Sequence, residues 1–117
     1  MSFNKKIKNK IKKHALEDFP NECCGLIIGT EEGEDTYKCN NQAKDKKNFF
    51  RIGVEDYLSA STEGEVMGCY HSHTEEHHCL GFSEFDKKTG KAHELKLIMY
   101  SVGKDEFKEY IPHGEID

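Results

Sequence analysis

The spacing of apolar residues changes along the chain and predicts which segments are helices and which are strands. In the first segment Ile7, Ile11 and Leu16 fall close to one helical stripe, and Pro20 follows the segment. Apolar residues three or four positions apart share one face of a helix, and a proline disfavours its continuation. The pattern therefore predicts a helix over residues 4–18.

Alternating and short apolar runs after this helix predict strands. In residues 65–73, Met67, Cys69 and two histidines occupy every second position, in alternation with Val66 and Tyr70. A period of two is typical of a strand, whose successive side chains point to opposite faces. The other runs that predict strands are residues 23–29, 36–40, 49–52, 95–102 and 107–111.

Two more helices complete the predicted elements. Residues 54–61 form a short one, and another begins at Ser83; polar loops cover residues 41–48 and 74–82. We find no internal repeat and no linker. The order of elements indicates one domain over residues 1–117 of the α/β (α+β) class, mostly sheet with helices around it.

Composition and charge exclude several classes of protein. The chain has 117 residues, of which 35% are hydrophobic and 33% charged, so it is too apolar for a disordered protein. Its net charge of -5 does not favour a nucleic-acid partner, and the lysines of the first segment fit a solvated helix face. No run is long and apolar enough to span a membrane, and no secretory signal is present. We expect a cytoplasmic protein without a nucleic-acid or membrane partner.

The cysteines do not form a disulfide framework or a zinc ribbon. Their number is odd, their spacing is irregular and no C-x-x-C is present. We expect reduced thiols, several of them buried as small apolar residues. The five are Cys23, Cys24, Cys39, Cys69 and Cys79.

The strongest candidate for chemistry is the pair His71 and His73 in the expected strand 65–73. Side chains two residues apart in a strand point the same way, about 7 Å apart along the backbone, and can converge on one ion. Zinc binds imidazole nitrogen readily, and a catalytic zinc has three protein ligands and an open position for water. A bare H-x-H also occurs without a metal, so a third ligand decides its meaning.

Asp86 is the candidate for that third ligand. It lies three residues after Ser83, in a segment that resembles the start of a helix, where a carboxylate has a fixed orientation near the positive end of the helix dipole. The same spacing also fits a capping box without a metal. The nearby H-x-H favours the interpretation as a ligand.

Together these motifs resemble the JAB/MPN metalloprotease family, whose members are also called JAMM proteins. The family pattern is an upstream Glu, then H-[S/T]-H-P and then S-x-x-D. Seven residues, counted from the second His and including the Pro, separate that His from the Ser. The upstream Glu matches Glu22, which lies in residues 20–29 (PNECCGLIIG), a segment typical of the prokaryotic and phage branch. Asn41, Lys47 and residues 49–52 fall where that branch has an N-x-A…F-x-I/L stretch. The likeness covers nearly the whole chain.

The resemblance implies a fold, a cofactor and roles for particular residues. The implied fold is a JAB/MPN-like (cytidine-deaminase-like) mixed β-sheet flanked by helices. His71, His73 and Asp86 match the ligands of a Zn²⁺ ion. Glu22 matches the general base that holds the attacking water and later protonates the leaving amine. Ser83 matches the residue that donates a hydrogen bond to the developing oxyanion.

Two departures from the family pattern affect the loop after the histidines. Thr74 replaces the proline, and nine residues instead of seven separate His73 from Ser83. Extra length costs little when both ends of a loop are anchored. A solvated polar loop is the simplest interpretation, but the loop also carries residues that could displace the catalytic water or bind a second metal. These are Glu75, Glu76, His77, His78 and Cys79. An alignment with Glu84 as ligand is poorer because it loses the S-x-x-D spacing.

Three functions fit these observations. The first is a zinc metallopeptidase, a hydrolase that cleaves a peptide or isopeptide bond. Its substrate would be the C-terminus of a ubiquitin-like or sulfur-carrier protein, or a tail or cell-wall peptide in a phage tail role, which would make the protein virion-associated. The second is a non-catalytic MPN-like interaction module. The third is a structural zinc site that recruits Cys69 or Cys79 and closes the fourth position.

Overall fold

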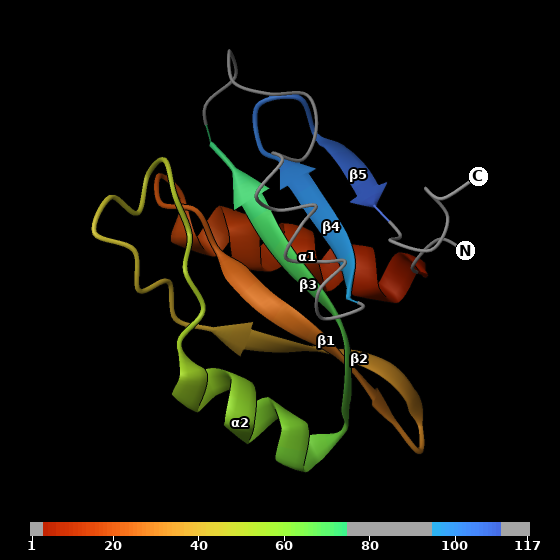
Figure 1. Cartoon of the computed structure of the whole chain (residues 1–117). Coiled ribbons are helices and arrows are strands. Elements are labelled where there is room, and N and C mark those ends of the chain that lie inside the picture. Colours follow the sequence, from red (N-terminus) through yellow and green to blue (C-terminus); the bar gives the residue numbers. More distant parts are fainter. Residues whose placement is uncertain (1–3, 75–94, 111–117) are drawn as a thin grey trace, which may run out of the picture.

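A five-stranded sheet with one helix on each face forms the core of the computed structural model, which describes residues 4–74 and 95–110 (Figure 1). Its elements are α1 (Lys5–Asp18), β1 (Cys24–Thr30), β2 (Gly33–Cys39), α2 (Val54–Glu63), β3 (Glu65–His73), β4 (Lys96–Ser101) and β5 (Glu106–Tyr110). The helix expected from Ser83 lies outside the described residues, and so does Asp86. No helix in the described part of the chain has the length and apolarity needed to cross a membrane.

The sheet is mixed, as the resemblance to the JAB/MPN fold implies. Its strand order is β2-β1-β3-β4-β5. β1 pairs antiparallel with β2 and with β3, and β4 pairs antiparallel with β5. β3 and β4 are parallel, and the chain between them includes residues 75–94. The predicted class, a mixed sheet flanked by helices, is confirmed.

The α1 helix covers one face of the sheet. It begins at Lys5, and the side-chain oxygen of the preceding Asn4 accepts a hydrogen bond from the Ile7 N–H at 2.8 Å and so caps the first turn. Leu16, expected on the apolar stripe, is 53% exposed, because its spacing from Ile11 places it beside the buried stripe. The residues that pack on this face are Ile7, Ile11, Ala15, Cys23, Ile27, Tyr70, Ile98 and Tyr100.

A polar contact joins α1 to β3 inside this layer. The His14 Nδ1 and the Tyr70 hydroxyl are 2.7 Å apart, and the His14 Nε2 lies 3.3 Å from an Asp18 carboxylate oxygen. Burial lowers the pKa of His14, so the ring is neutral near pH 7. With the Nε2–H directed at Asp18, the Nδ1 accepts a hydrogen bond from the Tyr70 hydroxyl.

The opposite face of the sheet carries α2, and a bulge in β3 corrects the expected alternation. The buried residues here are Cys24, Leu26, Ile28, Cys39 and Ala60. Val66 and Cys69 both pack against them, although Val66 was expected to face the same way as Tyr70. The β1–β3 register shifts so that Ile27 pairs with Gly68 and Ile28 with Val66, which leaves Met67 as the extra residue of the bulge. Residues of β3 before Met67 therefore face the opposite side of the sheet from that expected.

The strand expected over residues 49–52 is wrong. Only Ile52 forms a bridge, to Asn41, because side-chain hydrogen bonds from Asn41 hold this segment in place of a strand ladder. Within the described residues, the other predicted helices and strands agree with the observed bounds to within a few residues. The β1–β2 hairpin is tighter than expected, with Gly33 at a φ of 115° after its turn, a backbone conformation that glycine adopts without strain.

Candidate metal and catalytic site

The pairing of β1 with β3 brings Glu22, His71 and His73 to one edge of the sheet. Cys24 lies opposite His71 in the antiparallel register. Beyond that pair, the Ser72 N–H donates to the Cys23 carbonyl at 3.0 Å, and the Cys23 N–H donates to the Ser72 hydroxyl oxygen at 2.8 Å. The two segments therefore stay paired for one more residue, Cys23 with Ser72. Glu22 comes to lie beside His73, and a Glu22 carboxylate oxygen is 3.7 Å from the His73 Nδ1.

The two histidine rings lie close together on one side of β3, as the H-x-H spacing predicts. Their centroids are 5.1 Å apart. His71 stacks on the Phe50 ring, with centroids 4.3 Å apart and planes 13° from parallel. Burial, with a smaller contribution from His73, lowers the pKa of His71 to about 3. His71 is therefore neutral at physiological pH, which is the form that can donate a nitrogen lone pair to a metal.

Glu22 is a buried carboxylate whose position is fixed by the loop between β2 and α2. Only 2% of its surface is exposed. Its N–H donates to the Lys46 carbonyl at 2.7 Å, and its carbonyl accepts a hydrogen bond from the Asn41 Nδ2 at 3.0 Å. Acidic side chains are rarely this buried without a specific partner, so the site holds Glu22 in a defined place.

Asn41 is the residue that organises this loop, and sequence spacing identified it only as part of the family likeness. Its Nδ2 donates to the carbonyls of Glu22 and Phe49, at 3.0 and 2.9 Å. Its Oδ1 accepts from the N–H groups of Ala43 and Arg51, at 3.0 and 3.1 Å. One side chain thereby fixes both the backbone of Glu22 and the segment whose Phe50 ring supports His71.

We expect Asn41→Ala to lower the free energy of unfolding by about 2–3 kcal/mol, because it removes four hydrogen bonds to the backbone, two of them partly buried. Urea denaturation measures the change. Asn40→Ala is the matched control, since the Asn40 side chain is exposed, and it should change stability by less than about 0.5 kcal/mol. Equal effects of the two substitutions would show that Asn41 does not hold the loop.

Thr74 takes a structural role at the position where the family pattern has proline. Its hydroxyl donates to the Lys47 carbonyl at 2.7 Å. The His73 carbonyl next to it accepts a hydrogen bond from the Val102 N–H at 3.0 Å. The end of β3 is thus tied to the β2–α2 loop on one side and to the end of β4 on the other. These ties hold His73 without a proline.

The predicted zinc site is described only in part. Within residues 4–74 and 95–110 no three His, Cys, Asp or Glu side chains lie close enough together to hold a metal ion. The predicted third ligand, Asp86, and the predicted oxyanion donor, Ser83, lie outside those ranges, as do Glu84 and the loop residues from Glu75 to Cys79. The described residues supply the imidazoles of His71 and His73 and the buried carboxylate of Glu22 on one side of the sheet. Together with one more ligand, this set of donors fits zinc.

The thiols do not strengthen the alternative of a structural zinc site. Cys23, Cys24 and Cys39 are buried and Cys69 is half-buried, and none of these four is in a disulfide. Burial raises the pKa of Cys23 and of Cys39 to about 12 in each case, so both stay protonated at neutral pH. A thiol binds zinc as its thiolate, and Cys69 forms no metal-holding group with other described residues. Cys79 lies outside those residues.

Comparison with known families agrees with this geometry. The family described as prokaryotic homologs of the JAB domain matches residues 4–110. The chain belongs to this family. The match includes the whole described sheet of the JAB domain, the segment that holds Glu22 and both histidines. It also spans the predicted Ser83 and Asp86.

This JAB domain is similar in sequence to a phage protein and in fold to two solved structures. It is 29% identical over 106 residues to "Tail tip assembly protein K" of Escherichia phage N15, a match that covers 91% of this chain and 43% of the relative. The JAB domain thus spans less than half of that protein's length. A solution structure from Desulfitobacterium hafniense has a TM-score of 0.69 at 23% identity, covering 92% of this chain and 88% of its own.

A second solution structure, from Salinibacter ruber (strain DSM 13855), has a TM-score of 0.62 at 20% identity, covering 95% and 81% of the two chains. At these identities the two structures support the fold alone.

Proposed function

We propose that this JAB domain is a zinc-dependent peptidase or isopeptidase that cleaves an amide bond. The observation that carries the proposal is the Glu22 carboxylate 3.7 Å from the His73 Nδ1, beside a second histidine that burial keeps neutral. A buried acid next to two potential metal ligands is the arrangement that a metal-assisted hydrolase needs. Membership of the JAB family supports the same reading.

The roles proposed for Glu22, His71 and His73 rest on where their side chains lie, and those proposed for Ser83 and Asp86 rest on the family pattern. His71 and His73 present imidazole nitrogens to the ion, and Asp86 supplies the third ligand. When bound there, zinc supplies a water whose pKa is lowered to about 7. Glu22 takes a proton from the attacking water and returns it to the leaving amine. Ser83 donates a hydrogen bond to the oxyanion that develops on the carbonyl.

We place this activity in phage tail assembly. The support is the likeness to a tail tip assembly protein over 91% of this chain. The substrate is then a peptide of the tail or of the cell wall. The protein is accordingly associated with virions or located in the cytoplasm where they assemble. The alternative substrate, the C-terminus of a ubiquitin-like or sulfur-carrier protein, serves as the comparison in the experiment.

A substrate panel tests the proposal. Purified protein is incubated with fusions of ubiquitin-like proteins and with cell-wall peptides, with and without a chelator. We expect hydrolysis of a cell-wall peptide, loss of that activity with chelator and its return with added zinc. A zinc-loaded, folded protein that cleaves no member of the panel would instead support the non-catalytic interaction module.

A further inference from the structure

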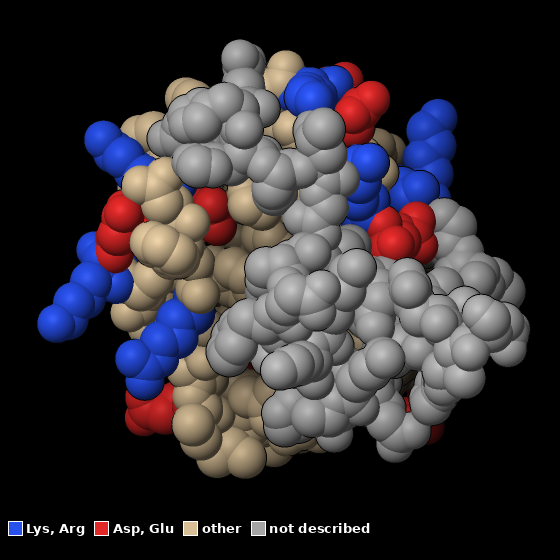
Figure 2. Space-filling model, turned by 45° about the horizontal axis from the view of Figure 1, so that its top comes forward, with Lys and Arg blue, Asp and Glu red and all other residues tan. Residues whose placement is uncertain are grey.

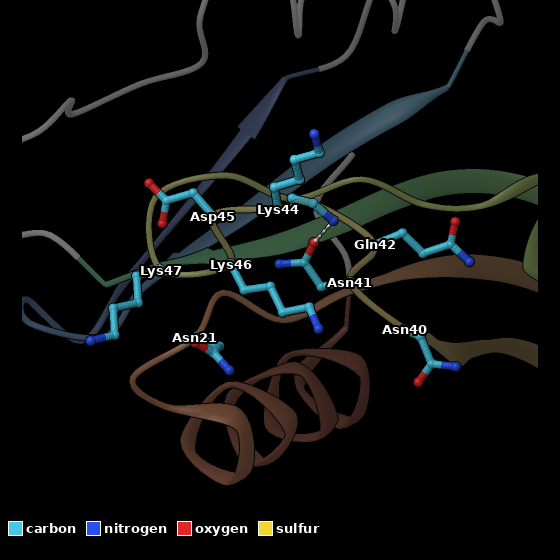
Figure 3. Close-up of a pocket in the computed structure, with 9 residues that line it drawn as sticks. Asn21, Asn40, Asn41, Gln42, Lys44, Asp45, Lys46 and Lys47 are labelled. Atoms are coloured by element: carbon cyan, nitrogen blue, oxygen red, sulfur yellow. Dashed lines mark hydrogen bonds between the residues drawn. The ribbon is translucent and has the colours of Figure 1, made fainter.

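A polar pocket of about 730 Å³ lies beside the candidate site, between the β2–α2 loop and the end of α1 (Figure 3). Pockets of this volume are large enough for a small ligand or a few residues of a peptide. The Lys46 side chain extends over the pocket between Asn21 and Asn40, whereas Lys47 points away from its centre (Figure 3). We call it the lysine pocket; its lining includes Asn21, Asn40, Asn41, Lys44, Lys46 and Lys47.

The lysines of the pocket carry positive charge that the described part of the protein does not neutralise. No ion pair joins Lys44, Lys46 or Lys47 to a residue in the described ranges. The only acid among the described lining residues is Asp45, and its carboxylate accepts a hydrogen bond from the Asn48 Nδ2 at 2.9 Å. Figure 2 shows blue side chains at its left edge, the side on which Figure 1 shows this loop, with red side chains among them.

Within the described residues, three lysines of α1 are paired with acids, unlike those of the pocket. On α1, Lys8, Lys10 and Lys12 each form an ion pair, with Glu109, Asp35 and Asp105 respectively. The chain as a whole has a net charge of -5. A local group of unpaired cations attracts anions even on a protein whose net charge is negative. The charge therefore suits a ligand with carboxylates.

The lysine pocket is continuous with the candidate site through the backbone. Asn21 precedes Glu22 in the chain, and the Lys46 carbonyl accepts the Glu22 N–H at 2.7 Å. The Lys47 carbonyl accepts the Thr74 hydroxyl, one residue after His73. These contacts place the lysine-bearing loop next to Glu22 and His73, within reach of the residues that neighbour a scissile bond held there.

We propose that the lysine pocket binds the carboxylates of an acidic peptide substrate and so selects acidic over neutral or basic peptides at the candidate site. This inference rests on the proposed function in treating the peptide as a substrate, but the binding itself needs no hydrolysis. Carboxylates that pair with Lys44 and Lys46 gain modest energy at this exposed surface, and basic side chains in the same place are repelled.

Peptide binding to the full chain tests this inference without relying on catalysis. The probes are a fluorescein-labelled octapeptide with three glutamates and its counterpart with glutamines, and binding is measured by fluorescence anisotropy at low salt. The variants are Lys44→Gln/Lys46→Gln and, as a control with the same change of net charge, Lys5→Gln/Lys6→Gln at the far end of α1. Both pairs are exposed, so circular dichroism should show folded protein.

We expect the glutamate peptide to bind more tightly than the glutamine peptide. Lys44→Gln/Lys46→Gln should weaken its binding about fivefold, the control should change it less than twofold, and raised salt should remove the difference. Equal binding of the two peptides would overturn the inference, and so would equal losses in the two variants. If lysine-dependent binding is found while the substrate panel shows no hydrolysis, the proposed function fails and the acidic-peptide site stands. If hydrolysis is found without lysine-dependent binding, the proposed function stands and the acidic-peptide site fails.

Discussion

Glu22→Gln is expected to lower the rate of amide hydrolysis by about 10²–10⁴-fold while the protein stays folded and keeps its metal. Glutamine has the size of glutamate but cannot take a proton from the attacking water. The Glu22 N–H donates to the Lys46 carbonyl and the Glu22 carbonyl accepts from the Asn41 Nδ2, so neither hydrogen bond involves the side chain that changes. The loss should therefore appear as chemistry and not as unfolding.

The measurement is the hydrolysis rate of the best substrate of the panel, with zinc content determined on the same samples. Glu63→Gln is the matched control, because Glu63 is an exposed glutamate at the end of α2. It should leave the rate within a factor of two. A Glu22→Gln protein that keeps more than about a tenth of the wild-type rate would remove Glu22 from the proton transfer.

Gly25→Ala is expected to destabilise the fold by about 3 kcal/mol. Gly25 lies opposite Tyr70 in the β1–β3 register, and a Cβ at Gly25 would overlap the Tyr70 ring. The ring has little freedom to move, because Tyr70 is fully buried and its hydroxyl contacts His14 at 2.7 Å. Urea denaturation measures the loss.

A double-mutant cycle shows whether the Tyr70 ring is the cause. Tyr70→Leu removes the ring atoms that the new Cβ would meet, although it destabilises the protein by itself. In that background, Gly25→Ala should cost less than about 1 kcal/mol. The same cost in both backgrounds would show that the close approach of the ring does not require glycine at this position.

The fold was predictable where periodicity was long and regular. The stripe of Ile7 and Ile11 placed α1 within a residue of its observed start, and the apolar runs placed four of the five strands close to their observed bounds. Periodicity failed where one residue changed the register. The bulge in β3 turns Val66 to the α2 face, and no feature of the alternation reveals it. Residues 49–52 have strand-like composition, but Asn41 satisfies their backbone through its side chain.

The candidate site was predictable in its residues and not in its geometry. A period of two was sufficient to place His71 and His73 on one side of a strand. Glu22 is far from His73 in sequence and reaches it only because Cys24 pairs with His71. The spacing of residues within one strand does not predict its register with another strand. The supports of the site, Asn41 and Phe50, act through contacts that a single sequence does not display. Ser83 and Asp86 stay predictions.

The central claim is that the edge of the sheet formed by Glu22, His71 and His73 holds a zinc ion. Its most direct test is metal analysis by inductively coupled plasma mass spectrometry on protein purified under reducing conditions without chelator. We predict about one zinc per chain for the wild type and for Glu22→Gln, and a small fraction of that for His71→Ala and for His73→Ala. Folded wild-type protein without zinc, or full zinc content in both histidine variants, would contradict the account.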